Sequence, residues 1–500
     1  MVDSLLVTTL LERLASHDQT SPAVYDEAGV ATFGDIDTGA RRVAAALLAE
    51  LGALEGKRVG VFASPGRHFL HAVLGVLHAG GCVLVLSPLH PEAESRYFCD
   101  DADVAAIVVT PDLAARAEGL SAGRAVLDVT ALTGAGEQLE VSRARGEDDA
   151  IMLYTSGTTG KPKGALLPHA SLAAQTAILR DLWAFGPHDV LLHALPLHHM
   201  HGLCIALFTA LGAGAAARMM PAWDALRVWE SMRDATVFMA VPTMYAKLFQ
   251  AFDAAAPDAR ARFAAHARAL RLAASGSAAL PVSLAERWRA VAGCIPLERF
   301  GMTEIGVGLS NPLDPRERRA GCVGLPPPSV EARIVGDSGE DAPTGELWIR
   351  GPSVFRGYHR REEATREAFA AGGWFKTGDT VTREEDGAYR ILGRTSVDIL
   401  KSGGYKLSAL EIEEALRDHP AVGEVAVIGL PDETWGERVV ACVVRRAEVT
   451  GPELRAFAKE RLAAYKCPKQ VVFLDDLPKN AMGKVQKPAL ARLVAGVASD

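Results

Sequence analysis

Short apolar runs alternate with helix-like stretches in the first part of the chain. Residues 40–48 have the apolar spacing of a helix, whereas residues 59–63, 82–86 and 106–109 have the length and apolar character of buried strands. Such alternation is typical of βα units, whose strands pair in parallel. The same rhythm returns in three later runs, at residues 190–195, 236–241 and 270–274. The pattern predicts an α/β fold with doubly wound, mainly parallel sheets.

The pattern changes after about residue 320, where polar and apolar residues alternate in short segments between tight turns. Residues 330–335, 345–350 and 387–392 show this alternation. A period of two residues is typical of strands with one buried face, so we expect a small antiparallel sheet or barrel here.

The last hundred residues return to an α/β pattern. Helices are expected at residues 411–416 and 454–462, and strands at residues 425–429 and 439–444. A second, smaller domain fits this change. We therefore predict an N-terminal domain over residues 1–395 and a C-terminal domain over residues 396–500.

One segment concentrates glycine, hydroxyl and lysine side chains directly after an apolar stretch. Residues 154–164 read Tyr-Thr-Ser-Gly-Thr-Thr-Gly-Lys-Pro-Lys-Gly, and we call them the glycine-rich segment. Backbone N–H groups, hydroxyls and ammonium groups together form a site for phosphates. Pro162 keeps the segment out of a helix, unlike the common phosphate loop. The nucleotide-binding candidates here are Thr155, Ser156, Gly157, Thr158, Thr159, Gly160 and Lys161. A plain surface turn is the alternative.

Composition narrows the class of ligand. The 500 residues are 49% hydrophobic and carry a net charge of −8, which favours a globular protein of at least two domains acting on small molecules rather than on nucleic acid. The seven cysteines show no metal or disulfide spacing, and no apolar run approaches the roughly 18 residues of a membrane span. We expect a cytoplasmic monomer without integral membrane association.

Four further polar clusters follow the glycine-rich segment. They lie at residues 275–278, 299–304, 377–379 and 393–394. In order and spacing the five clusters resemble the signature motifs of the adenylate-forming superfamily, which includes acyl-CoA synthetases, luciferases and peptide-synthetase adenylation domains. The resemblance covers essentially the whole chain. It implies ATP, Mg²⁺ and coenzyme A as cofactors and co-substrates.

The resemblance assigns nucleotide contacts that physical reasoning supports. Gly276 permits close approach of adenine, and Phe300 offers a stacking face. Thr303 can bond the α-phosphate, while Glu304, with Thr155, supplies hard oxygen ligands for Mg²⁺. Alone, a threonine here would be a helix cap and a glutamate an exposed ion.

Asp379 is a paired acceptor suited to the two ribose hydroxyls, and the resemblance places Arg394 beside it. The remaining nucleotide-binding candidates are Ser277, Ala278, Arg299, Gly301 and Met302.

Residues 477–487 match the superfamily's C-terminal motif, and we keep that name for them. In relatives the lysine matching Lys484 bridges the attacking carboxylate and the α-phosphate in the transition state. An ammonium that neutralises charge at phosphorus is reasonable chemistry. Without the match, Lys484 would be an ordinary solvated charge.

Residues 393–407 match the superfamily's hinge, about which the small domain swings after adenylation. Relatives carry Asp or Lys two residues after the arginine; this chain has Ser396 there and Asp398 two residues later, so either is a candidate pivot. The residues assigned to the thioester step are Lys401, Gly403 and Gly404. A β-hairpin turn at the two glycines is compatible with that role.

Three histidines, His198, His199 and His201, fall near the place of the acyl carboxylate in the superfamily. Their spacing without a carboxylate partner is weak for zinc, so a pocket wall is the better interpretation. We assign His199 to catalysis and acid binding and His201 to acid binding, although the sequence does not decide which of the three lines the pocket. Ser277 and Met302 complete this wall.

Several motifs, including residues 241–248, resemble malonyl-CoA synthetases more than fatty acyl ones. Lys247 matches a position that is a cation in that group, and a cation fits a dicarboxylate because an unpaired second charge in the pocket would be costly. An exposed helix lysine is the alternative. The resemblance implies malonate, with methylmalonate accepted.

Other functions stay open. A synthetase for medium-chain or other monocarboxylic acids is the nearest alternative. A peptide-synthetase adenylation domain is disfavoured by the absence of an acidic partner for an amino group, and a non-catalytic nucleotide or acyl-adenylate binding protein by the presence of Lys484 and Glu304.

Overall fold

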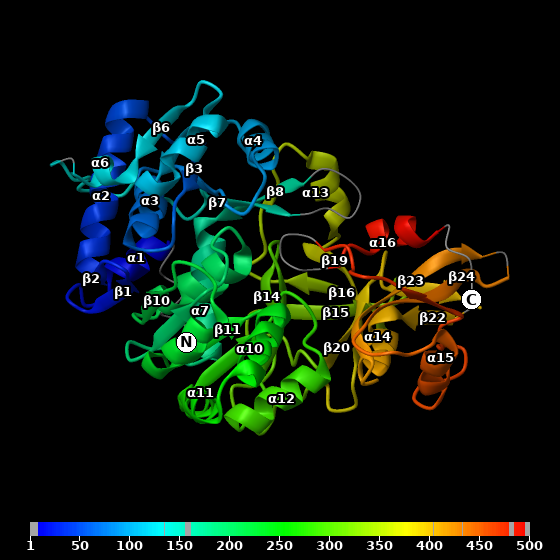
Figure 1. The fold of residues 1–500 in the computed structure, drawn as a ribbon. Coiled ribbons are helices and arrows are strands. Elements are labelled where there is room, and N and C mark those ends of the chain that lie inside the picture. The colour runs from blue at the N-terminus through cyan, green and yellow to red at the C-terminus, as the bar shows by residue number, and fades with distance from the viewer. Residues whose placement is uncertain are drawn as a thin grey trace.

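The computed structural model describes residues 9–134, 136–155, 162–403, 405–432, 434–479 and 485–495. Its described strands form an eight-stranded sheet, a seven-stranded sheet and two five-stranded sheets. Figure 1 shows the blue and cyan seven-stranded part above the mainly green eight-stranded part, with the C-terminal part at the right. None of the described helices has both the length and the apolar character needed to cross a bilayer.

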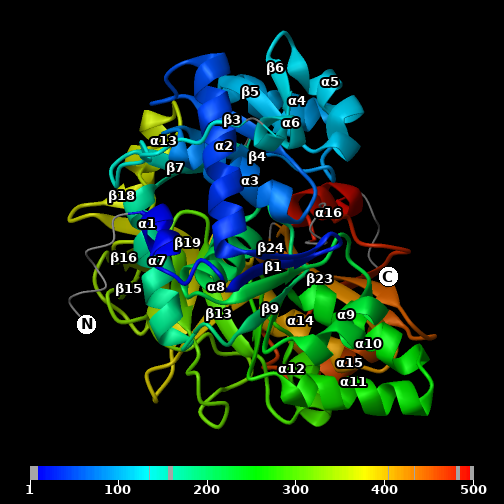
Figure 2. The same ribbon diagram turned by 90° about the vertical axis from the view of Figure 1, so that its left-hand side faces the viewer.

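The seven-stranded sheet contains the first three runs that the sequence predicts as strands. In spatial order its strands are β17 (Gly357–Tyr358), β8 (Lys163–Pro168), β7 (Asp149–Thr155), β4 (Cys82–Val85), β3 (Arg58–Phe62), β5 (Val104–Val109) and β6 (Ala125–Asp128). The strands from β7 to β6 are parallel. The helices of this part are α2 (Phe33–Leu51), α3 (Arg67–His78), α4 (Glu92–Asp101), α5 (Ala114–Ser121) and α6 (Val129–Gly134). Figure 2 shows α2 and α3 lying across β3 and β4.

The eight-stranded sheet carries the second set of predicted strands. Its order is β14 (Gly306–Ser310), β13 (Leu297–Met302), β12 (Leu272–Ser275), β11 (Val237–Ala240), β9 (Val190–His193), β10 (Ala216–Met219), β1 (Pro22–Asp26) and β2 (Gly29–Thr32). Neighbouring strands of this sheet pair in parallel, except at its two edges, where β14 and β2 each pair antiparallel with the next strand. Its helices are α1 (Leu10–Ala15), α7 (His169–Leu182), α8 (Thr209–Gly212), α9 (Ala225–Ser231), α10 (Pro242–Ala254), α11 (Pro257–Ala269) and α12 (Val282–Ala292).

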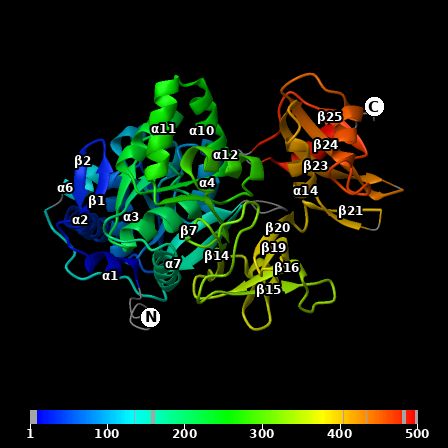
Figure 3. The same cartoon turned by 90° about the horizontal axis from the view of Figure 1, so that it is seen from below.

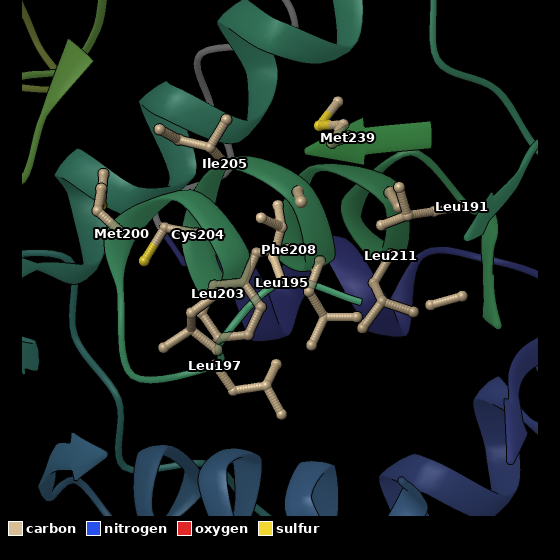
Figure 4. Packing of buried hydrophobic residues seen from close by; sticks show 14 of the residues in the cluster. Leu191, Leu195, Leu197, Met200, Leu203, Cys204, Ile205, Phe208, Leu211 and Met239 are labelled. Atoms are coloured by element: carbon tan, nitrogen blue, oxygen red, sulfur yellow. The ribbon is translucent and has the colours of Figure 1, made fainter. Parts of the chain in front are cut away.

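An unusual helix follows β9. The segment η3 (His201–Phe208) is a π-helix whose residues are all buried, and Figure 4 shows its apolar side chains packed among those of neighbouring segments. A Cβ on Gly202 would lie 2.2 Å from the carbonyl oxygen of Pro196, so only glycine fits. His193 Nε2 lies 2.8 Å from the carbonyl oxygen of Gly202. π-Helical turns are frequent at functional sites.

The predicted antiparallel region forms a five-stranded sheet. Its strands are β15 (Glu331–Val335), β16 (Thr344–Arg350), β19 (Trp374–Arg383), β18 (Phe369–Ala370) and β20 (Tyr389–Arg394), with α13 (Glu362–Ala368) beside it. The antiparallel pairing is confirmed. Within the described residues, however, the strand pairing forms an open sheet and does not close into the barrel that we considered.

The C-terminal part has its own sheet and its own apolar cores. It contains β21 (Ile399–Ser402), β22 (Tyr405–Ser408), β23 (Val422–Asp432), β24 (Gly436–Arg445), β25 (Gln470–Phe473), α14 (Ala409–Arg417), α15 (Gly451–Lys459) and α16 (Lys487–Val494). The main cluster of buried residues ends at Tyr389, and the C-terminal clusters begin at Leu400. Figure 3 shows this orange and red part beside the larger body. The predicted α/β fold is confirmed, and the boundary at residue 396 falls between the cores.

Candidate active site

The glycine-rich segment connects two paired strands. Thr155, the half-buried last residue of β7, pairs with Lys163 at the start of β8. Six of the nucleotide-binding candidates lie outside the described residues: Ser156, Gly157, Thr158, Thr159, Gly160 and Lys161. The structure therefore fixes the two ends of the segment, at the edge of the seven-stranded sheet.

Glu304 lies close to those ends. The tight turn between β13 and β14 carries half-buried Thr303 and buried Glu304. The Tyr358 hydroxyl donates a hydrogen bond of 2.8 Å to Glu304 Oε1, and Lys163 Nζ lies 5.0 Å from the centre of the Tyr358 ring. Burial raises the pKa of Glu304, while the Tyr358 hydrogen bond and the charges of Arg394 and Lys163 oppose that rise. Two motifs distant in sequence thus meet here.

The oxygen atoms at this place fit Mg²⁺. Mg²⁺ is commonly bound by one or two carboxylates together with substrate phosphates and water. Glu304 is one buried carboxylate beside the end of β7, where Thr155 adds a hydroxyl. No cluster of three metal-ligating side chains occurs in the described part of the chain. Residues Glu304 and Thr155 would hold the ion, which screens phosphate charge when bound.

Asp379 and Arg394, which the sequence assigns to the ribose and which we call the ribose pair, lie side by side. Asp379 and Arg394 are register partners in β19 and β20, and Arg394 Nε lies 3.2 Å from Asp379 Oδ1. Arg394 Nη1 also donates 2.7 Å to the carbonyl oxygen of Thr377. Because the guanidinium has these two partners, it holds the buried carboxylate of Asp379 in one orientation.

Arg299 is a buried cation with no ion-pair partner in the part of the chain that the structure describes. The side chain is 3% exposed, and burial lowers its pKa to about 9, so it is still charged at pH 7. Its Nη2 makes no hydrogen bond to any described residue. A Cβ on Gly276 would lie 2.4 Å from Arg299 Nε, so the glycine leaves room for the guanidinium as well as for the expected adenine. A buried unpaired charge is expensive, so an anion is the natural partner of Arg299.

His201 and Ser277 meet next to this guanidinium. His201 Nδ1 lies 3.1 Å from Ser277 Oγ. Ser277 has φ = +70°, a strained value for a residue other than glycine that is typical of functional sites. Burial, followed by the charge of Arg299, lowers the pKa of His201 well below its usual value. The imidazole is therefore neutral, and the positive charge at this position belongs to Arg299.

The rings of the other two histidines lie against each other at a tilt of 46°. The ring centres of His198 and His199 are 4.0 Å apart, and His90 lies 4.7 Å from His198. Burial lowers the pKa of His198 to about 2 and that of His199 to about 4. Both rings are neutral at pH 7, which fits the predicted pocket wall. His199 Nε2 has no hydrogen-bond partner in the described ranges.

The structure places the remaining predicted side chains at the same end of the eight-stranded sheet. Phe300 and Met302 are half-buried in β13, next to Gly301, and Ala278 is exposed beside Ser277. In doubly wound sheets ligands bind at the carboxyl ends of the strands. The ends of β12 and β13 are such a position.

Lys247 has a different environment. It lies on the exposed face of α10, whose buried face carries Met244, Tyr245, Leu248 and Phe249. Its assignment to the acid pocket stays a prediction.

The segment assigned to the thioester step lies apart from these residues. Gly403 is exposed at the end of β21, and Lys401 is exposed within that strand, whereas Gly404 lies outside the described residues. In the same hairpin, Lys406 Nζ pairs with Asp337 at 2.5 Å. The hairpin predicted at the glycines is present and contacts the turn between β15 and β16.

Two contact residues were not expected from the sequence. Tyr358 holds Glu304, and exposed Trp435 accepts a backbone hydrogen bond of 2.9 Å from Gly403 N. Neither residue belongs to a polar cluster. The only sequence signal that could have identified either of them as a site residue is an isolated aromatic side chain. Lys484 lies outside the described residues.

Replacing Tyr358 with phenylalanine tests the environment of Glu304. The phenol stabilises the ionised carboxylate, so its loss raises the pKa of Glu304 further, and the acid limb of the pH dependence of kcat/KM for ATP should move to higher pH. We expect about a three- to tenfold loss at pH 7. Tyr154→Phe is the matched control, because the Tyr154 hydroxyl donates to Asp101 instead. An unshifted acid limb in Tyr358→Phe would show that Glu304 ionisation does not limit the reaction.

Comparison with known proteins identifies the class. Residues 11–359 match the AMP-binding enzyme family, and residues 411–484 match the C-terminal domain of AMP-binding enzymes. The chain belongs to this family. The sequence-based prediction of an adenylate-forming enzyme, an AMP-forming acid–thiol ligase, is confirmed.

Individual relatives are similar over most of their length. The malonate–CoA ligase of Arabidopsis thaliana is 39% identical, over 88% of this chain and 78% of its own length. The mitochondrial malonate–CoA ligase ACSF3 of Bos taurus is 40% identical, over 88% of this chain and 82% of its own. The crystal structure of ATP-bound MatB from Rhodopseudomonas palustris superimposes with a TM-score of 0.90 at 36% identity, over 98% of this chain and 99% of that one.

Proposed function

We propose that the protein is an ATP-dependent ligase that joins malonate to coenzyme A, and that it also accepts methylmalonate. Malonate and ATP give malonyl-adenylate and pyrophosphate; the thiol of coenzyme A then displaces AMP to form the thioester. The activity named for the two malonate–CoA ligases agrees with the acid predicted from sequence.

The burial of Arg299, without a partner among the described residues, is the observation that carries this proposal. Malonate keeps one carboxylate after the other has attacked phosphorus, and that charge must enter the pocket. Arg299 supplies a fixed charge there, and the Ser277 hydroxyl, 3.1 Å from His201 Nδ1, adds a hydrogen bond. Bidentate binding of a carboxylate by guanidinium is among the strongest polar contacts in proteins. A monocarboxylate would leave Arg299 buried without a partner.

The other residues take roles around the nucleotide. Asp379, held by Arg394, accepts hydrogen bonds from the ribose hydroxyls, and Thr303 bonds the α-phosphate beside Glu304. The glycine-rich segment holds the β- and γ-phosphates. Lys484 neutralises the charge that builds on phosphorus as the carboxylate oxygen attacks and pyrophosphate leaves.

We also propose the two-domain division at residue 396, a C-terminal domain that moves between the two half-reactions, and a cytoplasmic monomer. Separate apolar cores on the two sides of residue 396 support the division. The cysteines without disulfide spacing support a cytoplasmic location, and the match of residues 393–407 to the superfamily's hinge supports the motion of the C-terminal domain.

Turnover of malonate, methylmalonate, acetate and octanoate, measured side by side, tests the acid. Pyrophosphate release and thioester formation should both be fastest with malonate, with methylmalonate second. Preference for octanoate or acetate would replace the proposal by a monocarboxylate ligase. ATP binding without turnover of any acid would indicate a non-catalytic binding protein.

A further inference from the structure

Lys487 lies between two carboxylates inside the C-terminal part. Its Nζ is 2.6 Å from Asp398 Oδ1 and 2.7 Å from Glu413 Oε1, and the three side chains are only 10%, 15% and 8% exposed. We call these three residues the buried ion triad. Glu413 Oε1 also accepts a hydrogen bond of 2.8 Å from Val427 N. Three charges so far removed from water require one another, because breaking one pair leaves an uncompensated buried ion.

The triad connects to the ribose pair. Asp398 Oδ2 accepts a hydrogen bond of 3.0 Å from Arg394 N, and Asp398 N donates 2.8 Å to the Arg394 carbonyl oxygen. A Cβ on Gly393 would lie 2.3 Å from the Cβ of Asp398, so glycine is required for this approach. The side chain of the same Arg394 holds Asp379. A continuous set of contacts therefore runs from Asp379 to Lys487.

The triad also holds the two described ends of the C-terminal motif, residues 477–479 and 485–487, which we call the foot. Lys487 is the first residue of α16, three positions after Lys484 in the sequence. Gln486 N donates 2.7 Å to the Pro478 carbonyl oxygen, and Lys479 and Val485 form an antiparallel bridge. Since Lys479 and Val485, which flank residues 480–484 in the sequence, pair here, whatever fixes the foot fixes both flanks of that segment.

We propose that Lys487 is a positioning residue for the adenylation half-reaction. Its ammonium, held by Asp398 and Glu413, fixes the foot of the C-terminal motif against the turn that carries Arg394. The foot is thereby held at a set distance from the ribose pair. This inference rests on the proposed function, because it gives Lys484 its role in adenylate formation.

Within the buried ion triad, Lys487 is the residue whose substitution should have the largest effect, because it carries the single positive charge between two carboxylates. Methionine has a similar shape but no charge, so Asp398 and Glu413 would repel each other and the foot would shift. Displacements of about 1 Å can lower a rate about 10²-fold even when made far from the reacting atoms. Arginine keeps the charge and should restore most of the rate.

The experiment compares two partial reactions of the full chain. Malonate-dependent pyrophosphate exchange reports adenylate formation, and thioester yield from synthetic malonyl-adenylate and coenzyme A reports the second step. In Lys487→Met we expect kcat of exchange to fall about 10- to 100-fold, with KM for ATP and malonate within threefold and the second step within twofold. Lys487→Arg should stay within about threefold of the parent.

Lys466→Met is the matched control. Lys466 also lies in the C-terminal part and pairs with Glu411 at 2.5 Å, but its side chain is 24% exposed and it lies outside the C-terminal motif. We expect less than a twofold change, because exposed ion pairs contribute little. Equal losses in the two methionine variants, or equal losses in both partial reactions of Lys487→Met, would overturn the proposal as mere destabilisation.

A double variant separates positioning from misfolding. If the Lys487–Asp398 pair acts as a unit, Asp398→Asn combined with Lys487→Met should lose no more exchange rate than Lys487→Met alone; additive losses would contradict it. Lys484→Met measured in parallel keeps the two proposals apart. Full exchange in that variant would remove the proposed role of Lys484, whereas lost exchange there with normal exchange in Lys487→Met would overturn only the role of Lys487.

Discussion

Lys484→Met is expected to lower the rate of malonyl-adenylate formation by at least about 10³-fold and to leave thioester formation from preformed malonyl-adenylate within twofold. The loss of charge removes the group that balances negative charge on the pentavalent phosphorus. Attack by the coenzyme A thiol takes place at the acyl carbon and breaks its bond to the phosphate oxygen, so that AMP leaves. No bond to phosphorus forms or breaks in that step, and it therefore does not need this group. Pyrophosphate exchange and single-turnover thioester formation measure the two steps.

The binding constant for ATP supplies the control for this variant. We expect it to change by less than threefold, because the glycine-rich segment and the ribose pair hold the nucleotide before the reaction. A large loss of ATP affinity, or parallel losses in both half-reactions, would assign Lys484 to ground-state binding or to stability instead.

Arg299→Met is expected to lower kcat/KM for malonate about 10²- to 10³-fold, mainly through a higher KM. Removing one partner of a buried charge pair leaves the free carboxylate of malonate without compensation in the pocket. The same variant should use acetate no worse than the parent does, because acetate brings no second charge. Arg299→Lys should recover only part of the rate, since an ammonium lacks the paired donors of a guanidinium.

Lys247→Met is the matched comparison for Arg299→Met. The sequence favours Lys247 as the cation for the second carboxylate, but its exposure on α10 leads us to expect the smaller rise in malonate KM, because water screens an exposed charge. A larger effect in Lys247→Met would return that role to Lys247. A raised KM for ATP with unchanged malonate kinetics in Arg299→Met would confine Arg299 to the nucleotide-binding role predicted from its motif.

Much of the site could be read from local motifs. Asp379 and Arg394 pair as expected because each stands in a short polar cluster within a β-strand pattern, and Thr303 with Glu304 occupies the turn that its motif suggests. Tyr358 was missed because a single tyrosine between strands carries no spacing signal. Its role depends on β17 pairing with β8 across nearly two hundred residues of chain.

Much of the fold could also be predicted from the sequence, including which strands pair in parallel and which pair antiparallel. The βα rhythm predicts parallel strands because both faces of such strands are buried, and the period of two after residue 320 predicts antiparallel pairing. Sheet order was not predictable, since β1 joins β10 and β7 joins β4 through contacts that no local pattern records. The π-helix at His201 also escaped, because its cause is the approach of Gly202 to the Pro196 carbonyl oxygen.

The motifs along the sequence predicted the chemistry: a phosphate-binding segment, a ribose pair, a carboxylate for Mg²⁺ and a reactive lysine, each from short polar clusters and from the family that those clusters resemble. The tertiary structure alone decided which charges are buried and which are screened. It left Lys247 exposed to water, enclosed Arg299 without a partner among the described residues, and brought Lys487 between Asp398 and Glu413. Burial is a property of how distant segments pack, and the free energy of a charge depends on that burial far more than on its neighbours in sequence.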